Sequence, residues 1–161
     1  MRVYHGSTTE ISKPDVNHSK RNLDFGAGFY VTSIQEQAEN WARRKALRMK
    51  ASAVVSVYEL DDAMSGFFVK EFADNNSEWV EFVCACRRGS DLYQQYDAIV
   101  GGVANDKVYL VVDMYYRGIW DMERTLLELR FIEQNDQICL LNQQLIDIHL
   151  AFLESYEVEK K

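Results

Sequence analysis

Three residues in the first quarter of the chain have the types and the spacing needed to hold a planar, polar ligand. His5 is followed by Gly6 and Ser7, and a glycine, which has no Cβ, lets a ligand approach the backbone closely. Tyr30 follows a glycine-rich turn, and Trp41 lies eleven positions further on. Two such rings could sandwich a planar group. Each residue alone is also compatible with an ordinary place in the core, so only their combination predicts a site.

The other histidines and the cysteines are interpreted as structural. His18 and His149 have no partner at the spacing of metal ligands. The cysteines are three, an odd number, and their spacings match no zinc pattern. Cys84 and Cys86 lie two apart in an apolar, helix-like segment, which predicts that at least one thiol is buried as a small hydrophobe. We therefore predict no metal site.

Length and charge narrow the class of protein. The 161 residues predict one domain over 1–161, and 18 basic against 25 acidic residues give a net charge of −7. The one basic cluster, residues 43–50, is interpreted as a solvated helix face, so sequence-specific DNA binding is not expected, although RNA as a substrate stays open. No apolar run is long enough to span a bilayer, and the N-terminus does not resemble a signal peptide. These features predict a cytoplasmic protein without membrane contact.

Hydrophobic periodicity predicts the elements that must position these residues. We expect strands over 2–6, 53–60, 67–72, 96–102, 137–141 and 150–158, and a glycine-rich turn that runs into a further strand over 25–32. We expect helices over 33–50, from 77, from about 106 and around 122–129. Ser33, with Glu36 three residues on, predicts a capping box, and Ser77 a second cap. The elements do not alternate strictly, and no G-x-G-x-x-G motif joins a strand to a helix. The pattern excludes a Rossmann fold and favours an antiparallel α+β architecture.

The motifs at these positions resemble the His-Tyr-Glu branch of the ADP-ribosyltransferase superfamily, which includes the poly(ADP-ribose) polymerases and the diphtheria-toxin-like enzymes. The likeness rests on His5-Gly6-Ser7 in a first strand and on Gly28-Phe29-Tyr30-Val31-Thr32 in a second. It implies a fold of split antiparallel β-sheets with flanking helices, and NAD as a substrate.

The same resemblance implies which residues hold NAD. His5, with Gly6 and Ser7, would bind a ribose and the amide, and Gly28 would lie in the cofactor-binding turn. Tyr30 and Trp41 would sandwich the nicotinamide, with Trp41 in place of the usual tyrosine.

A small bacterial family placed in that superfamily resembles the chain over most of its length. Short blocks match in the same order, at 3–7, 24–26, 37–38, 41–42, 97, 101, 104–106 and 135–137. Genes of this family often lie beside one for a small second protein. The resemblance thus also implies the toxin of a toxin–antitoxin or phage-defence pair, with a small antitoxin-like partner.

Gln137 marks the departure from the superfamily pattern. Other members carry a glutamate there, whose carboxylate bonds the nicotinamide-ribose hydroxyl and stabilises an oxocarbenium-like transition state. Glutamine brings no charge to that cation, and electrostatic stabilisers of this sort are commonly worth about 2.7–4 kcal/mol. We expect slow or substrate-assisted mono-transfer rather than polymer elongation, with Glu133 and Asp136 as nearby acids that could substitute.

These inferences predict a NAD-dependent mono-ADP-ribosyltransferase acting on a protein or nucleic acid, with His5, Tyr30 and Gln137 as its catalytic residues. A NAD glycohydrolase would use the same site. The alternative, which Gln137 favours, is a catalytically weak or inactive sensor of NAD or ADP-ribose, or an interaction module. A structural α+β domain without a nucleotide site is the third possibility.

Overall fold

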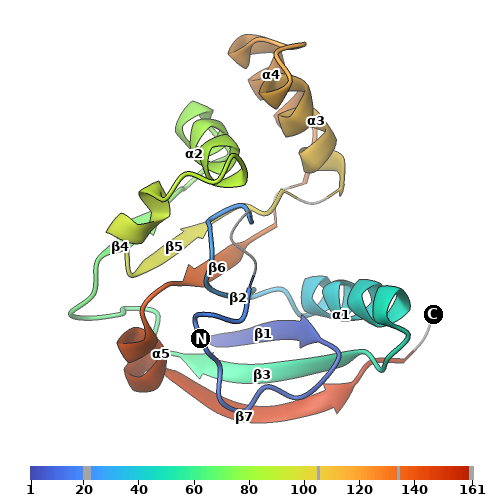
Figure 1. The fold of residues 1–161 in the computed structure, drawn as a ribbon, viewed down its shortest axis with the longest axis vertical. Coiled ribbons are helices and arrows are strands. Elements are labelled where there is room, and N and C mark those ends of the chain that lie inside the picture. Colours follow the sequence, from blue (N-terminus) through green and yellow to red (C-terminus); the bar gives the residue numbers. More distant parts are fainter. Residues whose placement is uncertain (20–22, 105, 134, 160–161) are drawn as a thin grey trace.

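The computed structural model describes residues 1–19, 23–104, 106–133 and 135–159, and within these ranges it has two open sheets and five α-helices (Figure 1). The strands are β1 (Arg2–Ser7), β2 (Phe29–Val31), β3 (Val54–Leu60), β4 (Val69–Glu71), β5 (Ala98–Gly101), β6 (Gln137–Leu140) and β7 (Leu150–Glu157). The helices are α1 (Gln35–Met49), α2 (Ser77–Arg87), α3 (Asp106–Tyr116), α4 (Met122–Leu129) and α5 (Gln143–His149), with the 3₁₀-helix η1 (Leu92–Gln95). The predicted α+β class is confirmed. No described helix combines the length and the apolar character needed to cross a membrane.

The first sheet has the order β1-β3-β7, is antiparallel throughout and lies beside α1 (Figure 1). Small residues let the helix approach the sheet. A Cβ on Gly6 would lie 2.0 Å from the backbone oxygen of Ala38, and Ala42 packs fully buried in the same cluster as Val55 of β3. Close packing against α1 therefore requires a glycine at position 6, whatever its role in binding.

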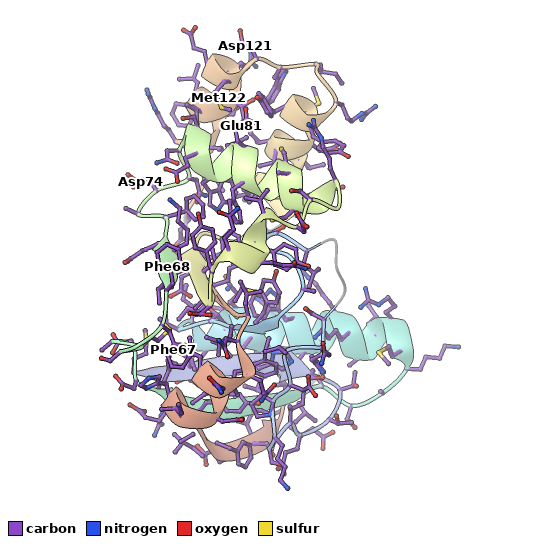
Figure 2. All side chains as sticks on the ribbon, turned by 60° about the vertical axis from the view of Figure 1, so that its left-hand side comes forward. Phe67, Phe68, Asp74, Glu81, Asp121 and Met122 are labelled. Carbon is purple, nitrogen blue, oxygen red and sulfur yellow. The ribbon has the colours of Figure 1, made fainter. Side chains whose placement is uncertain are left out.

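The second sheet has the order β2-β6-β5-β4, and one of its three pairs, β4 with β5, is parallel. Parallel neighbours need a crossover, which α2 provides. Side chains alternate along a strand, so Phe29 and Val31 face the first sheet, whereas Tyr30 faces the helices above. Figure 2 shows side chains filling the space between α2 and this sheet. Trp79 of α2 is completely buried in the same cluster as Ile99 of β5.

Both predicted helix caps are wrong. The N-cap of α1 is Ile34, without a side-chain hydrogen bond, because the hydroxyl of Ser33 donates to the carboxylate of Asp136 instead. A charged acceptor makes a stronger hydrogen bond than a neutral one, so tertiary packing overrides the local cap. Helix α2 is capped by Asn76 rather than Ser77, since the Asn76 side chain accepts a backbone N–H of the first turn at 3.0 Å.

Two further elements differ from the prediction. Helix α5 was not predicted, because seven residues with only Leu145 and Ile146 buried give too few turns for a recognisable period. Strand β4 is shorter than the predicted 67–72. The backbone N–H of Phe68 donates to the carboxylate of Asp97 at 2.8 Å, and the Phe68 side chain lies at the surface ahead of the strand (Figure 2).

Candidate functional site

The candidate site lies where β1, β2 and β6 run side by side at the junction of the two sheets (Figure 1). The backbones of Tyr4 and Thr32 exchange two hydrogen bonds of 2.8 and 3.0 Å, which join β1 to β2. Two residues before Thr32, the backbone oxygen of Tyr30 accepts from the ring Nδ1 of His5 at 2.6 Å. The His5 side chain therefore links the two sheets at the point where β1 and β2 separate.

The geometry fixes the protonation of His5. A carbonyl oxygen can only accept, so Nδ1 carries the proton, and Nε2 of the neutral ring is an acceptor. The ring is 3% exposed and stacks on Phe29 at 4.5 Å, and burial, followed by the nearby charge of Lys45, lowers the pKa of His5 to about 3. Nε2 is buried without a hydrogen-bond partner. A hydroxyl or N–H of a ligand would satisfy it.

The rest of the His5-Gly6-Ser7 motif lies against α1. Nζ of Lys45, a partly buried residue of α1, donates to the backbone oxygen of Gly6 at 3.0 Å, and burial lowers the pKa of this lysine. Hydrogen-bonding direction alternates along a strand, so the Gly6 backbone faces the same side as that of Tyr4, toward β2. Ser7 is buried at the end of β1.

Tyr30 is held in the core by its hydroxyl, which donates to Gly26 at 2.6 Å and accepts from the backbone N–H of Phe25 at 3.0 Å. Its ring packs with Cys139, and burial raises the pKa of the phenol. Gly28 is also explained by packing, because a Cβ there would lie 2.7 Å from the sulfur of Cys139. The Tyr30 side chain therefore shapes the glycine-rich turn.

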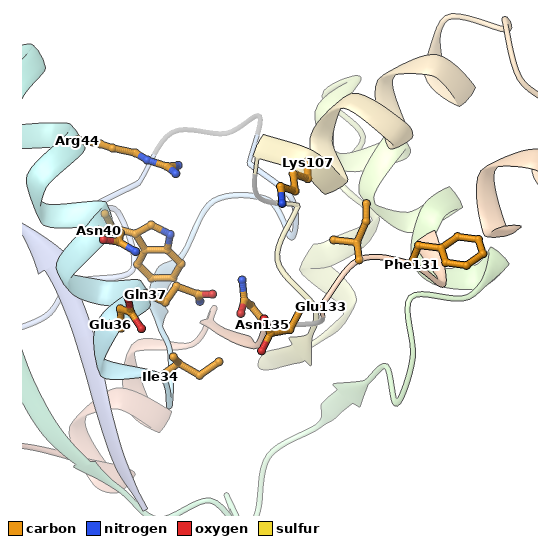
Figure 3. Close-up of a pocket in the computed structure, with 11 residues that line it drawn as sticks. Ile34, Glu36, Gln37, Asn40, Arg44, Lys107, Phe131, Glu133 and Asn135 are labelled. Carbon is orange, nitrogen blue, oxygen red and sulfur yellow. The ribbon is translucent and has the colours of Figure 1, made fainter. Parts of the chain in front are cut away.

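Trp41 lines a cavity of about 540 Å³ between α1 and the segment before β6 (Figure 3). Helix α1 contributes Gln37, Trp41 and Arg44 at helical spacing, and Glu133 and Asn135 lie opposite (Figure 3). The volume is within the range of small-molecule sites, and the wall combines one large indole with charged and amide groups. Such a wall can stack a planar ring and hydrogen-bond its substituents.

Gln137 belongs to a buried polar cluster on the helix-covered side of β6. Its Nε2 donates to the carboxylate of Asp24 at 3.1 Å and to the backbone oxygen of Gly102 at 3.2 Å. The same carboxylate pairs with Arg87 and accepts the backbone N–H of Ala104 at 2.9 Å. This cluster ties the start of β6 to α2 and to the end of β5.

Gln37 was not among the predicted site residues, and Asp136 was named only as a nearby acid that could substitute for the catalytic glutamate. The Nε2 of Gln37 donates to the backbone oxygen of Asp136 at 2.6 Å and to Thr32 Oγ1 at 3.0 Å, whereas its Oε1 is buried without a partner. The Asp136 carboxylate accepts from Thr32 Oγ1 at 2.6 Å and from Ser33. The available signal was a polar residue, Gln37, one turn before Trp41 on a face that is otherwise interpreted as core.

The predicted site residues thus fall into three places. His5, Gly6 and Ser7 lie along β1 beside α1, whereas Tyr30 and Gln137 point to the helix-covered face of the second sheet. The lining of the cavity includes Trp41 but neither Tyr30 nor His5. The nicotinamide sandwich between Tyr30 and Trp41 stays a prediction. Asn105, in one of the matching blocks, lies outside the described residues.

All three thiols, those of Cys84, Cys86 and Cys139, are free and buried, and burial raises the pKa of Cys86 to about 12. In the described ranges, no three histidine, cysteine or acidic side chains are grouped so that they could hold a metal ion.

The fold and the site define a two-sheet α+β protein with buried, unpartnered acceptors where its sheets join and a polar cavity beside them. A family described as "Protein of unknown function (DUF3990)" matches residues 1–152, so the chain belongs to that family. Searches of curated proteins and of solved structures found no match.

Proposed function

We propose that the protein is a NAD-dependent mono-ADP-ribosyltransferase, with an ADP-ribosyltransferase-like fold, that modifies a protein or a nucleic acid. The observation that carries the proposal is the link between His5 on β1 and the backbone of Tyr30 on β2, which itself pairs with β6, the strand that begins at Gln137. The three positions that the resemblance assigns to the NAD site therefore come from neighbouring strands. A chance likeness of short motifs would not require this arrangement.

His5 and Gly6 would anchor the nicotinamide end of NAD. A ribose hydroxyl can donate to Nε2 of His5, which is a neutral acceptor over the whole physiological pH range. The Gly6 carbonyl faces the gap between β1 and β2, where a carboxamide can reach it if Lys45 gives up its hydrogen bond. Trp41 supplies a surface for stacking, and the cationic chains of Arg44 and Lys107 in the same cavity suit a diphosphate.

The reaction breaks the C1′–N bond of NAD, and the bonding electron pair leaves with neutral nicotinamide. A nucleophile of the acceptor then bonds to C1′ and loses its proton. A carboxylate would stabilise the cation and take that proton. The neutral amide of Gln137 cannot do either. Of the two nearby acids, the Asp136 carboxylate already accepts hydrogen bonds from Thr32 and Ser33, whereas Glu133 lies exposed on the cavity wall. We therefore assign this role to Glu133.

The second candidate is a NAD or ADP-ribose sensor without turnover, and the surroundings of Gln137 favour it. The Gln137 amide is held between two acceptors, Asp24 and the Gly102 carbonyl. Gln137→Glu would replace this donor with an oxygen that faces two acceptors. We therefore expect the variant to lower the stability of the protein rather than to raise its activity.

The test is nicotinamide release from NAD by purified protein, with and without bacterial lysate. We expect release that requires lysate and falls at least about 100-fold in His5→Ala, because the anchor for the ribose is lost. His149→Ala is the matched control, since His149 hydrogen-bonds to Asp61 and Ser65, outside the site. Glu133→Gln should lower release without changing the affinity for NAD.

The other outcomes distinguish the candidates. Release without lysate indicates a NAD glycohydrolase with the same site. No release, with NAD binding that His5→Ala abolishes, establishes the sensor. If wild type neither binds nor cleaves NAD, both candidates are wrong.

From the resemblance alone, we also propose that the protein is a toxin restrained by a small partner protein. Expression in bacteria without that partner should arrest growth, and His5→Ala should not. Arrest by both proteins would separate toxicity from the NAD site.

A further inference from the structure

We infer that Gln37 is a specificity-determining residue of this cavity, whose Oε1 accepts a hydrogen bond from an amino group on a planar ring stacked on Trp41. The inference rests on the proposed function for the identity of the ligand, a pyridine–adenine dinucleotide. It goes beyond that function because neither the likeness to the superfamily nor the chemistry of transfer requires Gln37.

The Gln37 side chain is held in one orientation. It is 7% exposed, and Nε2 donates to two oxygens, the backbone carbonyl of Asp136 and Oγ1 of Thr32. The carbonyl of Asp136 can only accept, so the amide cannot be flipped. Its Oε1 is therefore a fixed acceptor, and it is one of two buried side-chain N or O atoms in the described part of the chain that have no partner.

An unpartnered buried acceptor is unfavourable, because it has lost its hydrogen bonds to water without gaining another. The other such atom is Nε2 of His5, and both residues hydrogen-bond to the segment Tyr30–Thr32 from different elements. The two side chains that carry these acceptors are therefore anchored to the same short segment. Both call for a donor in the ligand rather than an anion or another acceptor.

The position of Gln37 indicates what kind of donor it accepts from. Gln37 and Trp41 are one helical turn apart and both line the cavity, so a ring stacked on the indole brings its edge toward the amide. Oε1 is itself buried, so a ligand reaches it only if side chains of the cavity wall move. Asn40, which is exposed, and Asn135, which is partly buried, line the same cavity and can change rotamer. A planar ring with an exocyclic amino group fits this site.

Two groups of NAD have that chemistry, the carboxamide of nicotinamide and the amine of adenine, and ligand analogues distinguish them. Nicotinic acid adenine dinucleotide lacks the first amino group, and nicotinamide hypoxanthine dinucleotide lacks the second. We would measure binding of NAD and of both analogues by calorimetry to wild type, Gln37→Met and Gln35→Met. Gln35 is an exposed glutamine of the same helix outside the cavity lining, so Gln35→Met is the matched control.

We expect one analogue to bind wild type and Gln35→Met at least about tenfold more weakly than NAD, because it leaves Oε1 without a donor. In Gln37→Met this difference should shrink to within about twofold, since the acceptor is gone. If Gln37→Met does not fold, ¹⁵N NMR of wild type replaces it. NAD, but not the discriminated analogue, should then shift the side-chain amide signals of Gln37.

Three results would overturn the inference. If both analogues bind wild type as NAD does, water satisfies Oε1, and the proposed transferase function is unaffected. If the discrimination persists in Gln37→Met, or if the Gln37 signals respond equally to NAD and to the discriminated analogue, another residue hydrogen-bonds to the amino group. If no dinucleotide binds wild type at millimolar concentration, the proposed function fails and this inference fails with it.

Discussion

Two buried glutamines in this protein donate hydrogen bonds in the same way, but only one of them has a buried oxygen atom without a partner. Gln37 and Gln137 each donate two hydrogen bonds through Nε2, and each is more than nine-tenths buried. Gln137 joins the Asp24 cluster, whose buried side-chain atoms are all partnered, whereas Gln37 leaves Oε1 unpartnered beside a cavity. A polar cluster without buried, unpartnered atoms stabilises a fold, whereas a buried acceptor without a partner keeps capacity for a ligand. Burial alone therefore does not separate structural from functional polar residues.

The largest effect is expected in the paired cluster. Asp24→Asn removes the charge opposite Arg87, so we expect unfolding free energy to fall by about 3 kcal/mol in urea titrations. Asp62→Asn, at an exposed position, should change it by less than about 0.5 kcal/mol. If both variants were equally stable, the Asp24 cluster would not be a stabilising centre.

The second prediction concerns pH and His5. Its pKa is about 3 in the folded protein against an ordinary 6.5, so between these values the unfolded chain binds a proton that the folded protein does not. Stability should therefore fall as the pH drops below 6.5, and His5 should account for about 2 kcal/mol of the loss between pH 7 and pH 5.

Urea titrations of wild type and His5→Asn at both pH values measure this contribution. Asparagine can still donate to the Tyr30 carbonyl but does not titrate. The variant should lose about 2 kcal/mol less than wild type between pH 7 and pH 5. Equal losses would show that the imidazole is not kept neutral by burial.

The smallest effect compares the two glutamines directly. Gln37→Met and Gln137→Met each remove two donated hydrogen bonds, but only Gln37→Met also removes a buried acceptor that has no partner. We expect Gln37→Met to be less destabilising than Gln137→Met by about 1 kcal/mol in thermal and urea unfolding. The reverse order would mean that Oε1 of Gln37 is satisfied in the absence of a ligand.

The elements were predictable to the extent that local pattern encodes them. The β-branched run at 54–60 and the i, i+3, i+4, i+7 series from Trp79 to Cys86 gave a strand and a helix near the expected positions, and all three cysteines are buried. Prediction failed where a distant side chain took over a local role, as when Asp136 engaged the hydroxyl of Ser33. The parallel pairing of β4 with β5 likewise depends on the sheet as a whole.

For the site, the sequence by itself determined which side chains are available and on which strand or helix each lies, because period and turn chemistry involve only a few neighbouring residues. Only the tertiary structure decided which face and which partner each side chain has. The bond from His5 to Tyr30 spans 25 positions and that from Gln137 to Asp24 spans 113. Such pairs form only when packing brings distant segments together, and packing also leaves His5 and Gln37 as the two buried acceptors without a donor in the described part of the chain.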